Sequence, residues 1–402
     1  MTTALADRAP EGAAAVRIVL ARGLSSTGTF AVLPYLAVAI LDGHLASPSA
    51  AATLVGIYVL CLRAGGVLSA PTVRLLGRRK PLAVLYMAAA AFLLAGVITI
   101  ALGWPLTVLS GALFANALAV AVANVLTKAT IAAELDDQQR VLTFGALSRA
   151  INGGAAIGAL IGSLAVHYGM LAVLLPAVVL VGLAGAFCVG LPGIKNAEVG
   201  LNVRMEGGGW RPQVVFVLGT AMVWLAYVQF FAVLPIYAQG RAAADWVGVV
   251  FAINAVMIVG LQRLVLDRTA KLLSTASNQW AIYLAACGCM AGALALLCAV
   301  RTDAWPLLFV AIVLLTISEL FWSPLLDVWT ASVFGRRNLL AAYTITGLAW
   351  GGAEAAASSL SISVAAGAIT GVPWYGAIAI SGALVMAAAF GLKRIVASTS
   401  GV

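Results

Sequence analysis

Charged residues are scarce in this sequence. Asp, Glu, Lys and Arg together make up 9% of its 402 residues, whereas hydrophobic residues make up 63%. A soluble domain usually carries about a quarter charged residues, so this composition excludes an ordinary soluble protein. Apolar runs long enough to cross the hydrocarbon core of a bilayer recur along the whole chain. The sequence therefore predicts an integral membrane protein.

Histidine and cysteine are also rare, with two and five residues. The histidines, His44 and His167, fall between predicted spans, and the cysteines fall inside them without the ligand spacing of a zinc site. The motifs HExxH and GxSxG and a Gly-rich nucleotide loop ending in Lys-Ser/Thr are absent. We therefore expect no metal site, no cofactor and no enzyme activity. A membrane-embedded enzyme or scaffold is the least favoured alternative.

The apolar runs predict an all-α polytopic membrane protein with twelve transmembrane helices. We place these spans at residues 15–41, 49–73, 81–101, 105–133, 140–166, 168–192, 212–239, 243–265, 278–300, 304–331, 338–365 and 371–392.

The distribution of Lys and Arg between the spans predicts the orientation, because basic loops stay on the cytoplasmic side. If the N-terminus is cytoplasmic, Arg241 and Arg301 are the only Lys or Arg residues in the predicted loops on the opposite side. We expect a multi-pass protein of the cell's inner (plasma) membrane with both termini in the cytoplasm. The net charge of +9 then indicates contact with anionic lipid, and nucleic acid is not an expected partner.

An internal repeat divides the spans into two sets of six. The pentapeptide FAVLP occurs at Phe30–Pro34 and again 201 residues later, at Phe231–Pro235. Two shorter matches follow in the same order at similar offsets: Val55-Gly56 with Val247-Gly248, and Gly153-Gly154 with Gly351-Gly352. Such recurrence predicts two related halves. We expect pseudo-symmetric six-helix bundles at residues 1–194 and 212–402, joined by a cytoplasmic linker at 195–211.

With six plus six helices, a central linker and a basic loop between spans two and three, the chain resembles the major facilitator superfamily. That family carries in this loop Gly, three residues, Asp-Arg, one residue, Gly-Arg, and then Arg or Lys. Gly77, Arg78 and Arg79 keep the end of the motif, whereas Ala70 and Arg74 replace its first Gly and its Asp. The resemblance implies transport by alternating access. The change at Arg74 argues against a gating contact through the family's Asp.

The fifth predicted span carries Gly154, Gly158 and Gly162 at four-residue spacing. This spacing is similar to a glycine motif of antiporters in the same family, except that Ala159 stands in place of its Pro. Ordinary close packing of helices through small residues explains the spacing equally well.

Ionisable residues inside spans are costly and mark pathways or partners. The resemblance places every span that carries them around or beside a central cavity. They are basic in the first half and acidic in the second: Arg22, Arg63, Lys128, Arg149, Glu319, Asp327 and Glu354.

Two kinds of function are expected for these charges. Lys128 and Asp327 lie near the cytoplasmic ends of spans four and ten, so they are candidates for a gating pair; surface snorkelling is the alternative. Glu319 and Glu354 lie about 17 Å deep, where a carboxyl group pairs with a base or stays protonated until water reaches it. We expect Glu319, Glu354 and Asp327 to be the candidates for proton coupling. Arg63, a possible permanent partner of Glu354, and Arg149 are further candidates for charge pairs.

The repeated prolines, Pro34 and Pro235, are expected to kink spans one and seven. Aromatic and polar residues near these kinks and in span four predict a largely apolar cargo site: Tyr35, Asn116, Asn124, Trp224, Gln229, Phe230 and Tyr237.

These features predict a secondary active transporter. We expect a proton-coupled exporter (antiporter) of small amphipathic or hydrophobic compounds such as drugs or natural products. The alternative is a proton-coupled importer or a facilitator of a small organic anion or other solute, which the basic first half favours. Its partners are then the cargo, protons and lipid, and one twelve-helix chain is expected to work as a monomer.

Overall fold

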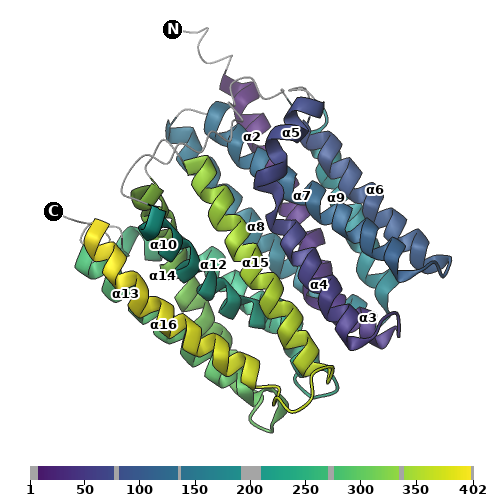
Figure 1. Ribbon diagram of the computed structural model, residues 1–402. Helices are drawn as coiled ribbons and strands as arrows, with labels where there is room; N and C mark the ends of the chain where they lie inside the picture. The colour runs from purple at the N-terminus through teal and green to yellow at the C-terminus, as the bar shows by residue number, and fades with distance from the viewer. Residues whose placement is uncertain are drawn as a thin grey trace. The chain divides into compact units, whose positions relative to one another are not determined.

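The computed structural model describes residues 8–76, 81–134, 137–191, 210–269, 276–334 and 339–399. In this part of the chain the regular structure is helical, without a strand (Figure 1). Each of the twelve predicted apolar stretches overlaps a helical segment, because a helix satisfies its own backbone hydrogen bonds in hydrocarbon. The fold class predicted from the sequence is confirmed.

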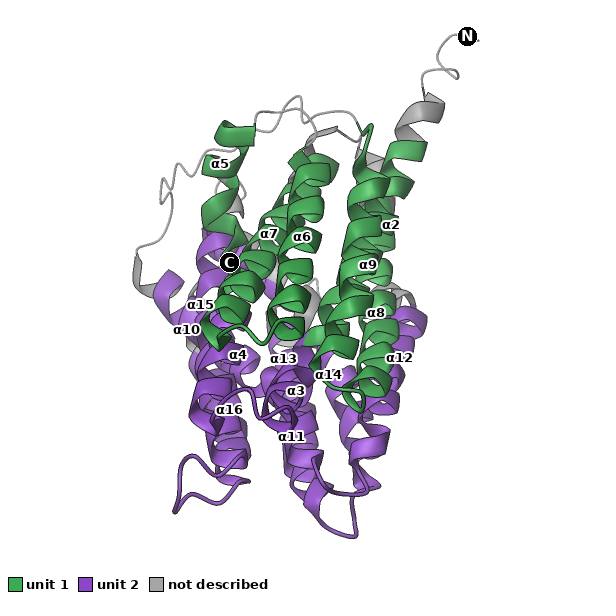
Figure 2. Ribbon diagram, turned by 90° about the vertical axis from the view of Figure 1, so that its right-hand side faces the viewer, with its two compact units in different colours: residues 1–32, 61–200 green, residues 33–60, 201–402 purple. Residues whose placement is uncertain are grey.

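The chain forms two compact units, coloured green and purple in Figure 2. The first comprises residues 1–32 and 61–200, and the second comprises residues 33–60 and 201–402. Residues 33–60 therefore belong with the second unit, although the sequence placed them in the first half. Hydrogen bonds within the second unit hold this segment: Ser359 Oγ donates to Ala52 O at 3.1 Å, and Gln239 Nε2 donates to Asp42 Oδ1.

In the first unit, α2 packs against α8 and α9, α6 packs against α7 and α9, and α5 packs against α7. The bounds of these helices are α2 (Arg8–Val32), α5 (Gly65–Leu76), α6 (Pro81–Ala101), α7 (Leu106–Glu134), α8 (Asp137–Val166) and α9 (Met170–Cys188).

In the second unit, α10 packs against α15 and α16, α13 packs against α14 and α16, and α12 packs against α14. Its helices are α3 (Leu36–Asp42), α4 (Pro48–Arg63), α10 (Trp210–Val228), α11 (Leu234–Ala238), α12 (Val247–Thr269), α13 (Ala276–Leu297), α14 (Leu307–Phe334), α15 (Leu339–Ala365) and α16 (Gly376–Thr399). The last residues of α4, 61–63, are assigned to the first unit.

The two packing schemes are the same. Replacing α2, α5, α6, α7, α8 and α9 by α10, α12, α13, α14, α15 and α16 converts the first set of helix pairs into the second. In each case a helix is replaced by the helix that lies six predicted spans later in the chain. The repeat read from FAVLP thus corresponds to a repeated helix arrangement inside each unit.

Eight helical segments within the described ranges are long and apolar enough to cross a membrane. A ninth is reached if α4 and α5, which are bent by 51° relative to each other, count as one span. Leu307–Trp322 of α14 and Gly376–Gly391 of α16 are shorter apolar helices. We therefore conclude that the chain is a membrane protein with several membrane-spanning helices.

Both copies of FAVLP interrupt a helix. At the first copy, α2 gives way to the 3-10 helix η1 (Leu33–Tyr35), which contains Pro34. At the second, α10 continues into the π-helix η2 (Gln229–Val233), and Pro235 follows in the first turn of α11. Proline lacks the N–H that would continue the α-helical ladder, so each helix changes geometry at this point.

The glycines of α8 form a close contact with α2. A Cβ atom added at Gly154 would overlap the carbonyl oxygen of Gly23, and one added at Gly158 would overlap that of Thr27. Ser26 Oγ also donates to Ile151 O at 2.8 Å between the same helices. Of the two interpretations of this glycine spacing, close helix packing is the one that these contacts support.

Candidate functional site

Glu319 lies in the middle of α14, where its carboxyl group accepts hydrogen bonds from two other helices. The Tyr227 hydroxyl on α10 donates to Oε1 at 3.0 Å, and Asn254 Nδ2 on α12 donates to Oε2 at 3.3 Å. The side chain is only half-buried. Both carboxyl oxygens are thus held by neutral donors at a position that retains some accessible surface.

The orientation of Asn254 is itself fixed. Its Nδ2 atom also donates to Thr316 Oγ1 at 3.0 Å, and Thr316 Oγ1 donates to Ile312 O at 2.7 Å. Thr316 precedes Glu319 by three residues on α14, so both residues present side chains to α12 from the same face. Among the residues that the structure describes, no basic side chain forms an ion pair with Glu319.

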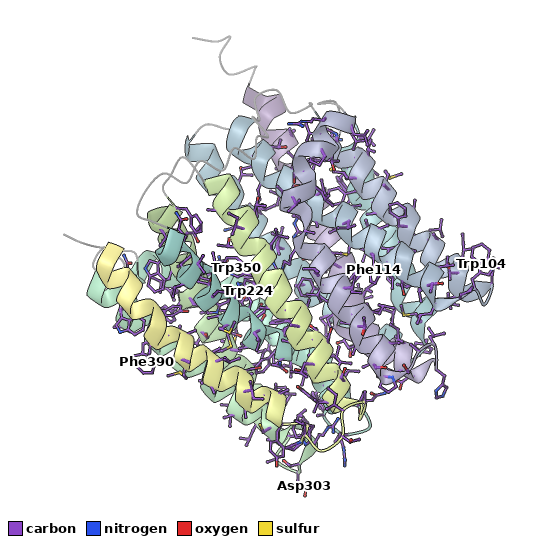
Figure 3. The ribbon with its side chains drawn as sticks, in the orientation of Figure 1. Trp104, Phe114, Trp224, Asp303, Trp350 and Phe390 are labelled. Carbon is purple, nitrogen blue, oxygen red and sulfur yellow. The ribbon has the colours of Figure 1, made fainter. Side chains whose placement is uncertain are left out.

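An aromatic cluster adjoins the Glu319 site. We define it as Trp224, Tyr227, Phe231, Phe251, Trp322 and Trp350. Trp224 is central: its ring centroid lies 5.2 Å from that of Tyr227, 5.2 Å from that of Trp322 and 5.4 Å from that of Trp350. Trp224 of α10 and Trp350 of α15, both labelled in Figure 3, stack on each other.

The cluster extends toward α12 through stacked rings. Tyr227 stacks on Phe231 at 4.4 Å, and Phe231 stacks on Phe251 at 5.5 Å. Tyr227 therefore belongs to the aromatic cluster through its ring and to the Glu319 site through its hydroxyl.

Two tryptophans of the cluster differ in their polar contacts. Trp350 donates from Nε1 to Thr220 Oγ1 at 2.9 Å. Trp322 is 2% exposed, and its Nε1 has no hydrogen-bond acceptor within the described part of the chain. A buried donor without an acceptor is costly, so the indole of Trp322 is a candidate for contact with a ligand or an ordered water.

Gln229 forms a second polar site in the π-helix. Its Nε2 donates to Ser361 Oγ at 2.9 Å and to Ser381 Oγ at 3.2 Å, and its Oε1 accepts from the Tyr237 hydroxyl at 2.8 Å. Gln229 and Tyr237 are 1% and 0% exposed, and Phe230 between them is equally buried. These three predicted cargo residues offer almost no accessible surface in this structure, and the hydrogen bonds of Gln229 join η2 to α11, α15 and α16.

The other predicted cargo residues are distributed over both units. Tyr35 in η1 is buried in the second unit. Asn116 on α7 is buried in the first unit and donates from Nδ2 to Ala89 O on α6 at 3.0 Å. Asn124 on the same helix is half-buried, and Trp224 is half-buried in the aromatic cluster. Of these residues, Trp224 is the one that belongs to the aromatic cluster, and its neighbour Tyr227 hydrogen-bonds Glu319.

The predicted intramembrane charges differ in exposure. Glu354 on α15 is 5% exposed, and Arg63 at the end of α4 is half-buried. Lys128 on α7 and Arg149 on α8 are exposed. The backbone of Asp327 lies in α14, but its side chain is outside the described residues, as are Gly77, Arg78 and Arg79. The charge pairs expected for these residues stay predictions.

Within the described ranges, no three His, Cys, Asp or Glu side chains lie close enough together to hold a metal ion.

The sequence did not single out six residues of the Glu319 site and the aromatic cluster: Tyr227, Phe231, Phe251, Asn254, Trp322 and Trp350. One signal was available for Tyr227 and Trp322. Tyr227 follows Trp224 by three residues and Trp322 follows Glu319 by three, so each pair shares a helix face. The position of Asn254 opposite Glu319 depends on how α12 and α14 are rotated against each other, which hydropathy does not report.

Comparisons with known proteins agree with this architecture. Residues 18–358 match the sequence profile of the Major Facilitator Superfamily. No curated protein matches the chain in sequence.

Solved structures of similar fold include a POT family transporter in complex with 5-aminolevulinic acid, with a TM-score of 0.76 and 13% identity over 97% of both chains. A D-xylose-proton symporter has a TM-score of 0.74 and 15% identity over 97% of this chain and 99% of its own. A point mutant of the nucleoside transporter NupG has a TM-score of 0.72 and 12% identity over 95% of this chain and 99% of its own. At these identities the likeness concerns the fold.

Proposed function

The chain belongs to the Major Facilitator Superfamily, and we propose that it is a proton-coupled secondary transporter that exports small amphipathic organic compounds by alternating access. Glu319 carries the coupled proton in this proposal. The cargo contacts the accessible rings of the aromatic cluster.

The environment of Glu319 is the observation that carries the proposal. A carboxyl group within a membrane span is expensive to keep and normally marks a partner or a proton path. Here it is half-buried and held by the neutral donors Tyr227 and Asn254, with no ion pair among the described residues. A group held in this way can gain and lose a proton without breaking a salt bridge. Glu354 is the second candidate for proton coupling, and Asp327 is the third.

The character of the cargo follows from the surface next to this carboxyl group. Trp224, Tyr227 and Trp350 are half-buried, so these aromatic residues retain some accessible surface in the second unit. Mostly apolar sites with a few placed polar groups suit amphipathic organic molecules. Acidic spans confined to the second half and this apolar surface favour export. Uptake of an organic anion together with protons is the alternative, which the basic spans of the first half favour.

The cellular setting completes the proposal. The transporter works as a monomer in the inner (plasma) membrane with both termini in the cytoplasm, as the Lys and Arg distribution favours. Lys128 and Asp327 close the cytoplasmic side of the pathway, and the alternative role of Glu354, in place of proton coupling, is a permanent pair with Arg63.

Transport in liposomes under an imposed pH gradient tests this function. Purified protein is reconstituted, and uptake of labelled amphipathic cations, neutral compounds and organic anions is followed with the lumen acidic and then with the outside acidic. Export in exchange for protons predicts that a compound accumulates only when the lumen is acidic. Accumulation only with the outside acidic would establish symport. Equal accumulation without a gradient dependence would refute proton coupling.

A further inference from the structure

We propose that Glu319 and the aromatic cluster bind an aromatic organic cation, and that the indole N–H of Trp322 donates a hydrogen bond to an acceptor on the same molecule. The inference rests on the proposed function, because it assigns the chemical class of the cargo at that site. It uses three features of the second unit: an uncompensated carboxylate, half-buried aromatic rings and a buried donor without an acceptor.

The carboxylate supplies the charge selection. Tyr227 and Asn254 orient its two oxygens but are neutral, so they leave the negative charge of ionised Glu319 without a counter-charge among the described residues. A cation in the site supplies that counter-charge, whereas an anion is repelled and a neutral molecule gains nothing.

The rings supply a second reason for a cation. The face of an indole or phenol ring carries negative potential and attracts a positively charged nitrogen, with tryptophan the strongest of the side chains. Trp224 and Trp350 stack at 5.4 Å, and both retain accessible surface. Tyr227 lies 5.2 Å from Trp224 and hydrogen-bonds Glu319, so ring faces and carboxylate belong to one site. Because the walls are aromatic, a cation that itself carries an aromatic ring gains stacking in addition.

The donor adds a requirement for an acceptor. Trp322 follows Glu319 by one helical turn on α14, and its ring packs edge-on against Trp224 at 5.2 Å. The side chain is only 2% exposed, and its Nε1–H has no hydrogen-bond acceptor within the described part of the chain. A carbonyl or ether oxygen of the cargo would satisfy this donor, so the preferred molecule carries both a cationic nitrogen and a hydrogen-bond acceptor.

One carboxylate cannot hold a proton and a cation at the same time. Binding of the cation therefore releases the proton of Glu319 to water, and binding of a proton releases the cation. Among the ionisable groups described on the helices packed against α14, Tyr227 is the one that hydrogen-bonds Glu319; the others are Tyr283, Cys287, Cys289, Cys298, Arg301 and Glu354. Cation binding should therefore weaken as the pH falls, and exchange of one monovalent cation for one proton moves no net charge.

Equilibrium dialysis of the purified full chain in detergent tests the charge selection, with empty micelles in a second cell to subtract partition into detergent. The probes are benzyltrimethylammonium and its neutral isostere neopentylbenzene. We expect the cation to bind about tenfold more tightly at pH 8 and to lose that advantage at pH 5.5. Equal binding of the two probes at pH 8 would overturn the inference.

Variants locate the effect. Glu319→Gln should abolish the preference for the cation and its pH dependence, and Glu319→Asp should restore part of both. Asp303→Asn, at an exposed residue labelled in Figure 3, should change neither.

Trp322→Phe tests the hydrogen-bond donor. It should remove the tighter binding of 4-acetylbenzyltrimethylammonium over its 4-isopropyl analogue, while the exposed control Trp104→Phe retains it. A cation preference that survives in Glu319→Gln contradicts the assignment.

The two proposals fail differently. If protons move through Glu319 but only neutral compounds are carried, the cation assignment is wrong and proton coupling stands. If cations bind at Glu319 but accumulate without regard to the pH gradient, the assignment stands and the proton-coupled function is wrong.

Discussion

The Tyr227 hydroxyl donates a hydrogen bond to Oε1 of Glu319 at 3.0 Å. The same tyrosine ring packs against Trp224, with 5.2 Å between the ring centroids. A molecule that displaces the Tyr227 ring therefore alters a hydrogen bond of the carboxyl group. This contact gives a physical route by which cargo binding changes the affinity of Glu319 for a proton.

Replacing Tyr227 by Phe should move the pH profile of transport. A donor to a carboxylate stabilises its ionised form, so its loss allows Glu319 to take up a proton at higher pH. Loss of about 1.4 kcal/mol of such stabilisation moves the half-maximal pH of cargo-driven proton movement upward by about one unit. The exposed Tyr375→Phe serves as a control. An unchanged or acid-shifted profile in Tyr227→Phe would contradict the role given to this hydrogen bond.

Neighbouring glycines on α8 should differ sharply in their tolerance of a side chain. A Cβ at Gly154 would overlap the backbone oxygen of Gly23, whereas a Cβ at Gly153 has no atom within 4 Å. We expect Gly154→Ala to lower the free energy of unfolding by about 1–3 kcal/mol. Gly153→Ala should be neutral or stabilising by up to about 1 kcal/mol, because alanine is the better helix former. Thermal unfolding in detergent compares the two; equal melting temperatures would argue against the α2–α8 contact.

Two buried glutamines at different positions of span seven provide a matched pair. Gln229→Leu removes three hydrogen bonds and leaves the Tyr237 hydroxyl without this acceptor, so we expect a loss of about 1–3 kcal/mol. Gln213 is also buried, but its Oε1 has no partner among the described residues. Gln213→Leu should therefore cost less than about 1 kcal/mol. A larger loss of thermal stability in Gln213→Leu than in Gln229→Leu would contradict this account of the π-helix.

The proposed cytoplasmic gate predicts a result for a charge exchange. Lys128→Asp and Asp327→Lys each place like charges at the contact, so each should lower transport about tenfold or more. The double variant restores opposite charges and should recover part of the activity. Uptake of labelled cargo into liposomes measures all three variants. If the double variant is no more active than either single one, Lys128 and Asp327 do not form a gate.

Hydropathy placed a helix in every predicted span, although it did not predict the 51° bend between α4 and α5. The span predicted at residues 81–101 coincides with α6, which begins at Pro81 and ends at Ala101. Proline is favoured in the first turn of a helix, where its missing N–H costs nothing. At the other end Gly103 has a φ of 65°, which favours glycine and lets the chain turn. Length, hydropathy and these local signals are all present in the sequence.

The cargo residues were harder to predict, because a side chain's direction depends on the rotation of its helix. Phe230 and Gln229 lie in a π-helix, whose extra residue per turn rotates the faces of the following segment relative to a regular α-helix. Both are buried rather than accessible, and Gln229 hydrogen-bonds Ser361 of α15 and Ser381 of α16. Glu319 could be singled out by charge and depth, but its partners Tyr227 and Asn254 could not, since their contacts depend on the packing of three separate helices.

The most direct test of the account measures cargo-driven proton movement across the membrane of liposomes that contain the purified protein. A pH dye in the lumen reports protons while an aromatic cation is added outside, for the wild type, Glu319→Gln and the exposed control Asp303→Asn. We predict proton movement opposite to the cargo in the wild type and in Asp303→Asn, and none in Glu319→Gln, which remains folded by thermal unfolding. Proton movement of undiminished size in Glu319→Gln would contradict the central claim and assign the proton to another group.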